Sequence, residues 1–228
     1  MAESASLFII IVAGGAGTRM GGTIPKQFLH LQGRAVIRHT MERFYKALPE
    51  ATQIIVLPQD HLTTFEQTLE NDPTTATYQV TTGGETRFHS VKNGLEQIPD
   101  TAGVVGVHDA VRPLVSTDVI QKAFATAAEE GNAIPAIPLK DSIRQMEGHR
   151  SHAVDRGLFR LIQTPQCFQV HQLKKAYERP FSNSFTDDAS VVEAAGYTIH
   201  LVPGNEENIK ITSPVDIPLA EVLLPGLR

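Results

Sequence analysis

The sequence is short of three features that would each define a class of protein. It has one cysteine, Cys167, so neither an internal disulfide nor a zinc site built from several thiolates can form. Its longest apolar run, residues 7–13, is far below the roughly 20 residues of a membrane span. Its 20 Lys and Arg are outnumbered by 25 Asp and Glu, and a net charge of -5 argues against a general binder of nucleic acid or anionic membranes. Any anionic ligand must therefore meet a local cluster of positive charge.

The first residues, MAESAS, also lack the marks of a targeting segment. They carry neither the basic flank of a signal peptide nor the Arg-rich pattern of a transit peptide. The single thiol suits a reducing compartment. We therefore expect a cytoplasmic protein with no nucleic-acid or membrane partner.

Composition and length predict an ordinary folded chain. Hydrophobic residues make up 41% and charged residues 20%, which lies well away from disordered, collagenous and coiled-coil sequences. On length alone, 228 residues fall between one large domain and two small ones. Because no repeat and no low-complexity linker divides the chain, we predict a single domain over residues 1–228.

Short apolar runs alternate with helical patterns through the first half of the chain. Residues 7–12 are apolar at every position, and residues 53–58 and 104–108 repeat this pattern. Helical spacing is found between them, over residues 35–47, 61–69 and 90–98. The alternation predicts an α/β fold, in which a mostly parallel sheet is covered by helices on its faces.

This rhythm breaks after Pro138. Residues 140–162 alternate polar and apolar side chains around Gly148, as a two-stranded arm would, and they are too polar to form a core of their own. We interpret residues 138–161 as an excursion from the main sheet that reaches a second subunit. The chain then resumes with a predicted helix from Asp187, a strand from Tyr197, a short strand over residues 208–212 and a last helix after Pro214.

The strongest local signal, AGGAGTRMGGTIPKQF, directly follows the first predicted strand. Its glycines let backbone N–H groups approach a polyphosphate, and Arg19 and Lys26 supply the positive charge that such an anion demands. A dinucleotide fingerprint would have a third glycine where Met20 stands, and a Walker loop would need Gly-Lys-Ser/Thr. We favour phosphate binding over the alternative, a strand-to-helix turn with two solvated cations. The glycines concerned are Gly14, Gly15 and Gly17.

A second segment, GGETRFHSVKNGL, follows another predicted strand. Ligands of open α/β sheets bind outside the carboxyl ends of the strands, so this loop could face the first one across a crevice. Gly83 and Gly84 would allow backbone contact with a flat base, while Ser90 or Arg87 could fix an edge or a phosphate. The alternative, a turn followed by a helix cap, carries equal weight when the segment is taken alone.

A third segment, VHDAVRPLV, delivers one carboxylate at the end of a strand. Proteins usually hold Mg²⁺ through one carboxylate and substrate phosphates, because this ion keeps several of its waters. Asp109 is therefore the candidate metal ligand. We interpret His108 and Arg112 as structural, respectively a strand-end hydrogen-bonding group and a buried ion-pair partner.

Taken together and in order, these segments resemble the 2-C-methyl-D-erythritol 4-phosphate cytidylyltransferases of the methylerythritol phosphate route to isoprenoids. The resemblance extends over almost the full chain, whereas the wider nucleotidyltransferase class shares only the first and third segments. It implies a Rossmann-like sheet, a homodimer whose arms complete each other's substrate pocket, CTP and methylerythritol phosphate as substrates, and Mg²⁺ as cofactor. The motifs that carry it are AGGAGTRMGGTIPKQF, GGETRFHSVKNGL, VHDAVRPLV, PLKDSIR, VDRGLFRLIQTPQCF, TDDASVVEAAG and LVPGNEENIKITSPVD.

The resemblance also implies roles for individual residues. By themselves Arg156 and Lys210 would pass for surface charges, but the family places such residues on the acceptor phosphate, Arg156 from the partner's arm. Arg19 and Lys26 would stabilise charge on the triphosphate, and Asp109 would lie near the ribose, the phosphates and Mg²⁺. The other implied substrate contacts are Ala13, Gly14, Gly15, Gly17, Gly83, Gly84, Ser90, Ser142, Thr164 and Thr186.

Three departures and three rival functions remain at this point. Gly14 stands where alanine is common, Ser142 replaces a common threonine, and Glu85 stands where some members have aspartate; the first two keep the needed size or hydroxyl.

The nearest rival function is a ribitol-5-phosphate cytidylyltransferase, which would differ only in the acceptor pocket. A non-catalytic CTP sensor would keep the glycines but should lose the charged residues. A nicotinamide dehydrogenase is disfavoured by the missing third glycine and by the lack of an acidic residue about 20 positions later.

Overall fold

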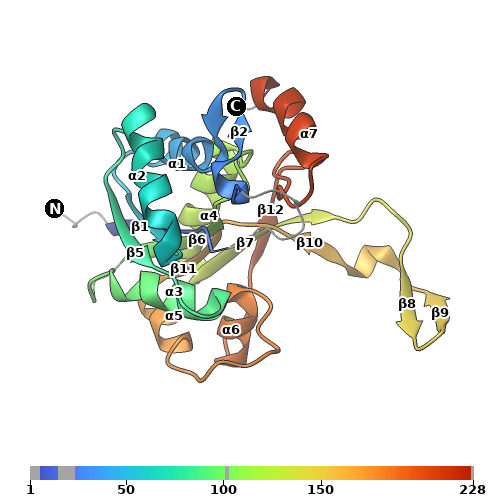
Figure 1. Cartoon of the computed structure of the whole chain (residues 1–228). Coiled ribbons are helices and arrows are strands. Elements are labelled where there is room, and N and C mark those ends of the chain that lie inside the picture. Colours follow the sequence, from blue (N-terminus) through green and yellow to red (C-terminus); the bar gives the residue numbers. More distant parts are fainter. Residues whose placement is uncertain (1–5, 15–23, 101–102, 227–228) are drawn as a thin grey trace.

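The computed structural model describes residues 6–14, 24–100 and 103–226, and strands and helices alternate along them. The strands of the main sheet are β1 (Ser6–Val12), β4 (Thr52–Leu57), β5 (Tyr78–Thr82), β6 (Gly103–Asp109), β7 (Asn132–Pro138), β10 (Arg160–Ile162), β11 (Gln166–Gln169) and β12 (Leu201–Pro203). The helices are α1 (Val36–Ala47), α2 (Leu62–Asn71), α3 (Arg87–Glu96), α4 (Thr117–Glu130), α5 (Val170–Ala176), α6 (Asp188–Ala194) and α7 (Asp216–Leu223). A small hairpin of β2 (His30–Leu31) and β3 (Arg34–Ala35) precedes α1. In Figure 1 the colours follow these elements along the chain, from blue at the N-terminus to red at the C-terminus.

The main sheet is mixed, with its parallel strands together. Its order is β10-β7-β11-β6-β1-β4-β5, and β12 pairs with β7. The neighbours β6, β1, β4 and β5 run parallel, whereas β11 is antiparallel to both β6 and β7, and β10 is antiparallel to β7. The predicted α/β class with a mostly parallel, helix-covered sheet is confirmed.

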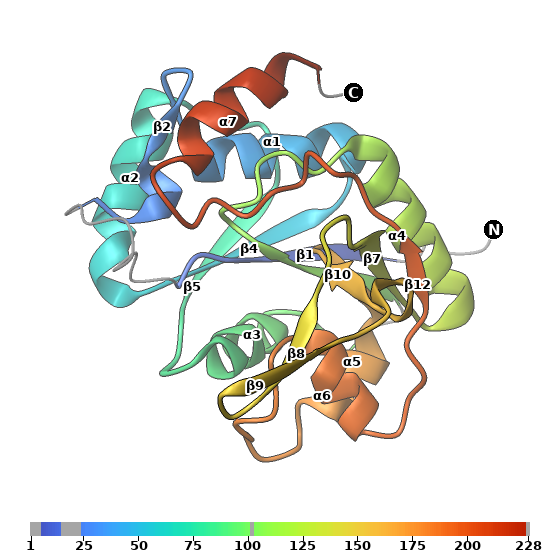
Figure 2. The same cartoon turned by 90° about the vertical axis from the view of Figure 1, so that its right-hand side faces the viewer.

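Two helical layers bury the two faces of the sheet. In Figure 2, α1, α2, α4 and α7 lie on one side of the strands, and α3, α5 and α6 lie on the other. Successive side chains of a strand point to opposite faces, so β1 supplies Ile9 and Ile11 to the core of the first layer and Phe8, Ile10 and Val12 to that of the second. This double burial explains why the strand is apolar at every position.

The arm leaves the body between β7 and β10. A hairpin of β8 (Arg144–Glu147) and β9 (Arg150–Ala153) forms its far end, with Gly148 in the turn at φ 59. A short 3-10 helix, η4 (Arg156–Leu158), follows it, and β10 then returns to pair with β7. Figure 1 shows the arm projecting away from the helical layers. The predicted two-stranded segment with a turn at Gly148 is therefore confirmed.

Two predicted strands near the C-terminus are wrong in extent or absent. From Tyr197 only β12 forms, because the Asn132 side chain bonds the backbone of Thr198 and His200, at 2.9 Å each, in place of a strand ladder. Residues 208–212 form no strand. Residues 208–212 lie beside a loop, and Ile211 N donates a backbone hydrogen bond to Val111 O of that loop at 2.9 Å. The helices predicted from Asp187 and after Pro214 are confirmed as α6 and α7.

Candidate active site

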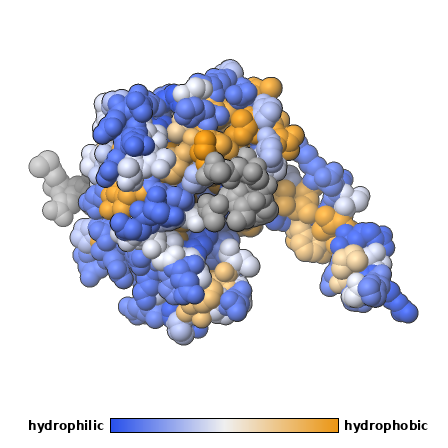
Figure 3. Space-filling model, viewed as in Figure 1, coloured by the Kyte–Doolittle hydropathy of each residue, from blue (hydrophilic) through white to orange (hydrophobic). Residues whose placement is uncertain are grey.

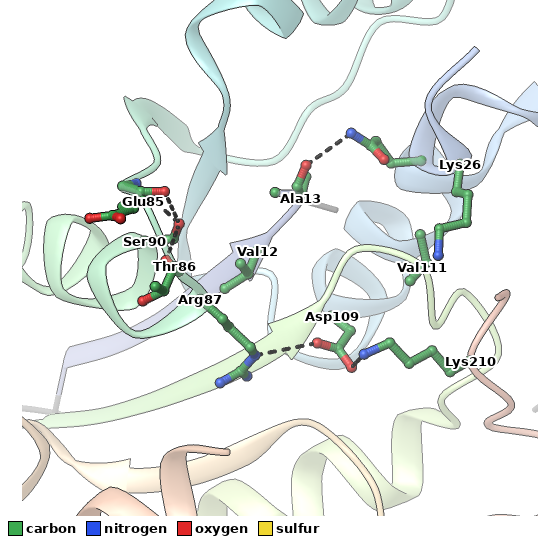
Figure 4. Close-up of a pocket in the computed structure, with 13 residues that line it drawn as sticks. Val12, Ala13, Lys26, Glu85, Thr86, Arg87, Ser90, Asp109, Val111 and Lys210 are labelled. Carbon is green, nitrogen blue, oxygen red and sulfur yellow. Dashed lines mark hydrogen bonds and ion pairs between the residues drawn. The ribbon is translucent and has the colours of Figure 1, made fainter. Parts of the chain in front are cut away.

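A cavity of about 270 Å³ opens at the carboxyl ends of β1 and β6, beside the loop that joins β5 to α3. Crevices at such strand ends are where open α/β sheets bind their ligands. Segments that are distant in sequence supply its walls, and Figure 4 shows their side chains around one space. The lining residues are Val12, Ala13, Gly14, Lys26, Gln27, Gly84, Glu85, Thr86, Arg87, Ser90, Asp109, Val111 and Lys210.

Asp109 lies at the floor of this cavity, and three cations of the described residues approach it. Lys210 Nζ is 3.0 Å from Oδ2, Arg112 Nε is 3.3 Å from the same oxygen, and Arg87 Nε is 3.7 Å from Oδ1. Burial would raise the pKa of the Asp109 carboxyl, but the charges of the three cations outweigh it and hold the pKa below its ordinary value. Asp109 is therefore ionised. Its Oδ1 contact with Arg87 is longer than the Oδ2 contacts with Lys210 and Arg112.

The buried histidine next to Asp109, His108, makes hydrogen-bonding contacts through both ring nitrogens. The Nε2 atom of His108 lies 3.0 Å from Arg112 O, and its Nδ1 lies 3.0 Å from Thr164 Oγ1, which also accepts a hydrogen bond from Asp109 N at 3.2 Å. Burial lowers the pKa of His108 to about 4, so its ring is neutral at pH 7. The structural interpretation of His108 and Arg112 fits these contacts. Thr164 lies behind the strand end and does not line the cavity.

The glycine pair after β5 packs closely on Ser90. Ser90 Oγ accepts a hydrogen bond from Gly84 N at 3.1 Å and donates one to Thr86 O at 3.0 Å. A Cβ added to Gly83 would lie 3.0 Å from Ser90 Oγ, and one added to Gly84 would overlap Cβ of His89. Thr86 caps α3, its side chain accepting a bond from His89 N. The segment is thus a tight turn and a helix cap. Residues 84–87 and Ser90 line the cavity, whereas Gly83 is not part of its wall.

Lys26 enters the cavity from the opposite wall. It begins a short 3-10 helix, η2 (Lys26–Phe28), and is 8% exposed. The neighbouring Gln27 donates from Nε2 to Ala13 O at 2.9 Å, which ties this helix to the end of β1. The structure thereby brings Lys26, Asp109 and Lys210 to one cavity, although they are far apart in sequence.

The remaining predicted contacts lie elsewhere or outside the described residues. Gly15, Gly17 and Arg19 belong to the segment 15–23, which the structure does not describe. Arg156 and Ser142 are exposed on the arm, and Arg156 donates to Lys140 O. Thr186 is exposed just before α6. One chain therefore does not bring Arg156, Ser142 and Thr186 into the cavity wall.

Three residues of the site were missed or left open by the sequence pattern. Glu85 and Thr86 line the cavity, and their position directly after two glycines was the available signal. Asp188 is completely buried and holds Arg87 through two hydrogen bonds, of 3.0 and 2.7 Å. No spacing rule links Asp188 to a partner 101 positions away.

The described residues contain no cluster of three or more His, Cys, Asp or Glu suited to a metal ion. In the described part of the chain, no helix is long and apolar enough to cross a membrane. A cation-lined cavity with the ionised Asp109, at the strand ends of a mostly parallel sheet, defines a nucleotide- or phosphate-binding α/β protein.

Comparison with known proteins specifies the family. The chain matches the family described as 2-C-methyl-D-erythritol 4-phosphate cytidylyltransferase over residues 7–225, and it belongs to that family. It is 45% identical over 216 residues to the protein of this name from Bacteroides thetaiotaomicron, covering 95% of this chain and 98% of the relative. The protein of the same name from Phocaeicola vulgatus is 46% identical over 216 residues, with the same coverage.

Solved structures agree with this assignment. The crystal structure of 2-C-methyl-D-erythritol 4-phosphate cytidylyltransferase from Thermus thermophilus is 31% identical, with a TM-score of 0.74, and covers 98% of this chain and 100% of that chain. The 4-diphosphocytidyl-2C-methyl-D-erythritol synthase from Anaerococcus prevotii is 26% identical, with a TM-score of 0.83, and covers 97% of this chain and 96% of that chain. The resemblance identified in the sequence motifs is thereby confirmed.

Proposed function

We propose that this protein transfers CMP from CTP to 2-C-methyl-D-erythritol 4-phosphate. The products are pyrophosphate and 4-diphosphocytidyl-2-C-methyl-D-erythritol, an intermediate of the non-mevalonate route to isoprenoid precursors. The observation that carries the proposal is the cavity that Lys26, Lys210 and Arg87 line together with the ionised Asp109, in a chain that belongs to this family over residues 7–225. Such a site suits a reaction between two polyanions.

The acceptor needs little activation. A phosphate monoester has a second pKa of about 6, so at neutral pH its oxygen is already a nucleophile. That oxygen attacks the α-phosphorus of CTP, the new P–O bond forms, and the bond to the bridging oxygen breaks in line, so that pyrophosphate leaves with the electron pair. No general base is required. The only thiol, Cys167, is buried, and burial raises its pKa, so it takes no part.

The work of the protein is to position the two substrates and to stabilise their charge. Lys26 and Lys210 both line the cavity, and we assign Lys26 to the charge that develops on the triphosphate. Lys210, which also pairs with Asp109, would position the acceptor phosphate. Gly84 and Ser90 line the cavity with Ala13 and Gly14, and they supply the wall against which the cytosine would lie.

We further infer that Mg²⁺ is the cofactor. Asp109 lies at the cavity floor and is ionised. Among the described residues, the ion-pair partner of its Oδ1 is Arg87, whose Nε is 3.7 Å away. One carboxylate together with the phosphates of bound CTP is the donor set that Mg²⁺ commonly accepts, so the residues fit the ion. When bound, Mg²⁺ would neutralise charge on the phosphates, and Asp109 would hold it.

The arm supports a proposal that two chains complete each site. Arg156 and Ser142 project away from the body with the arm, and large apolar side chains are exposed beside them, Leu158 at 81%, Leu161 at 51% and Met146 at 64%. In Figure 3 apolar surface gathers on the part of the arm near the body. A second copy of the chain would cover this surface, and its cavity would receive Arg156.

Subunit complementation tests the shared site. The variants Lys26→Ala and Arg156→Ala are co-expressed, and the mixed dimer is purified through two different tags. Transfer is assayed with the acceptor below its KM, where each variant alone should be inactive or weak. If the arm serves the partner, one site of the mixed dimer has both Lys26 and Arg156, and transfer returns to about half of the wild-type rate. No recovery in a confirmed mixed dimer would contradict the shared site.

Pyrophosphate release tests the reaction itself. CTP with Mg²⁺ is offered with methylerythritol 4-phosphate, with ribitol 5-phosphate or with no acceptor, and ATP, GTP and UTP serve as controls. Release with CTP and methylerythritol phosphate alone is the expected result. Release with ribitol phosphate instead would overturn the acceptor assignment, and CTP binding without release from any pair would favour a sensor.

A further inference from the structure

A fully buried carboxylate lies just behind the active-site wall, outside the cavity itself. Asp188, the first residue of α6, has a side chain with no exposed surface, and Arg87 Nη1 and Nη2 donate to its two oxygens at 3.0 and 2.7 Å. Tyr177 donates a third hydrogen bond from its hydroxyl to Oδ1 at 2.6 Å. A buried charge is retained only when it is paired and hydrogen-bonded, and Asp188 meets both conditions.

These contacts fix the plane of the Arg87 guanidinium. With Nη1 and Nη2 engaged by Asp188, Arg87 presents its Nε edge to Asp109, 3.7 Å away, which is longer than the 3.0 Å contact of Lys210. Figure 4 shows Arg87 and Lys210 approaching Asp109 from different sides. If its Nη atoms were released, the guanidinium could form a close two-point pair with Asp109, since both groups favour that geometry.

The same pair joins the two halves of the proposed site. Arg87 begins α3, directly after the turn that packs on Ser90, whereas Asp188 begins α6, two residues after Thr186. The ion pair therefore connects the segment after β5 to the segment of Thr186, a substrate contact that the family resemblance implies. Phe88 strengthens this connection, because its ring stacks on that of Tyr177 at 4.6 Å.

We propose that Asp188 is a positioning residue for the transfer reaction: through Arg87 it keeps Asp109 open toward the substrates and holds the start of α3 against the start of α6. The proposal rests on the proposed function, because the effect is on transfer. We expect Asp188 to affect the rate while the binding of CTP stays nearly unchanged, since its side chain bonds Arg87 and Tyr177 and not Gly84 or Ser90 of the cavity wall.

The test compares Asp188→Asn with Asp187→Asn. Both remove one carboxylate at the start of α6, but Asp187 caps the helix, a role that asparagine fills equally well, and it does not contact Arg87. For Asp188→Asn we expect kcat to fall about 10- to 100-fold, the scale for a misplaced catalytic group, with the KM for CTP within about threefold. Asp187→Asn should keep kcat within about twofold.

A double variant separates positioning from general damage. If Asp188 acts through Arg87, the variant Arg87→Gln/Asp188→Asn should turn over as fast as Arg87→Gln alone. A further loss of tenfold or more in the double variant, or an unchanged kcat in folded Asp188→Asn, would overturn the proposal. Should Asp188→Asn fail to fold, Tyr177→Phe keeps the ion pair but removes one hydrogen bond, and it should lower kcat by about two- to fivefold; an unchanged kcat would contradict the proposal.

A measurement on the protein without substrate distinguishes failure of the Asp188 proposal from failure of the proposed function. In ¹H–¹⁵N spectra of the full chain, the Arg87 Nη–H signals, assigned by their loss in Arg87→Gln, report on this restraint because both Nη groups donate to Asp188. Their chemical shifts should be the same in the wild type and in Asp187→Asn and should move in Asp188→Asn, and equal shifts in all three would overturn the restraint on Arg87. A wild type that shows this restraint yet transfers CMP to no acceptor would instead refute the proposed function.

Discussion

The nucleotide cavity and the arm differ in how fully one chain satisfies their charged groups. In the cavity, Asp109 pairs with Lys210, Arg112 and Arg87, and it is 8% exposed. On the arm, Leu158 is 81% exposed, and Arg156 is exposed with a hydrogen bond to Lys140 O. A charge network that is already paired and buried is preorganised, whereas an exposed cation on a projecting segment must be brought to its ligand. We expect from this comparison that nucleotide binding depends on the body of one chain and that acceptor binding depends on the arm.

The largest expected effect is on the cavity side. Replacing Lys26 with alanine should lower kcat by a factor of roughly 10² or more, because a cation aimed at developing charge is lost, while the fold is kept. Steady-state kinetics and circular dichroism check this. Normal turnover in the folded variant would remove Lys26 from the site and weaken the distinction between cavity and arm.

The neutral histidine beneath Asp109 gives the next effect, on stability. Burial lowers the pKa of His108 to about 4 from an ordinary value of 6.5. Between these pH values the unfolded chain binds a proton that the folded protein does not, so the free energy of unfolding falls as the pH is lowered. Urea unfolding at pH 7.5 and 4.5 should show a loss from this group of about 2 to 3 kcal/mol, and His108→Gln should lack this part of the loss. Equal pH dependence in both proteins would contradict the assignment.

A smaller and more selective effect is expected on the arm. Arg156→Ala should raise the KM for the acceptor about tenfold, the scale of one charge-assisted contact, and leave the affinity for CTP and the thermal stability unchanged. Arg150→Ala removes another exposed cation of the same arm and serves as the matched control, with unchanged kinetics. A CTP affinity that falls with Arg156→Ala would show that the arm also serves the nucleotide.

The smallest effect is expected at Ser90. Ser90→Ala removes the hydrogen bonds to Gly84 N and Thr86 O, at 3.1 and 3.0 Å, and so loosens the turn against which the cytosine would lie. Loss of such bonds costs about 1 kcal/mol, which corresponds to a roughly fivefold weaker affinity for CTP. Calorimetric titration checks this, and an equal weakening for UTP would show that Ser90 supports the turn without selecting the base.

The sequence predicted the parts of the fold that follow from local patterns. Periodicity and glycine chemistry predicted the strand over residues 7–12, the turn at Gly148 and the helices α1, α2, α3, α6 and α7, but not α4 or α5. Asp109 was identified because a strand end places a carboxylate in the crevice. The function was predicted from the family motifs. Arg156 and Thr186 stay predictions, because in one chain they lie outside the cavity wall.

Contacts between distant segments could not be predicted in this way. Nothing in the local pattern around Asp188 indicates that it pairs with Arg87, because the pair depends on how α6 packs against α3. The missing strand at residues 208–212 has a similar cause: the pattern is apolar enough, but the neighbouring backbone near Val111 is a loop and offers no ladder. Both outcomes were determined by tertiary packing.

The central claim is tested most directly by binding of CTP to a chain without its arm. Residues 139–159 are replaced by a four-residue glycine-rich turn, since Arg160 pairs with Pro138 across the two strands that would be joined. We predict that calorimetry shows a CTP affinity within about threefold of the full chain, while transfer to methylerythritol phosphate falls by a factor of at least about 10². A loss of CTP affinity of tenfold or more, or transfer at the full rate, would contradict the division of labour between the cavity and the arm.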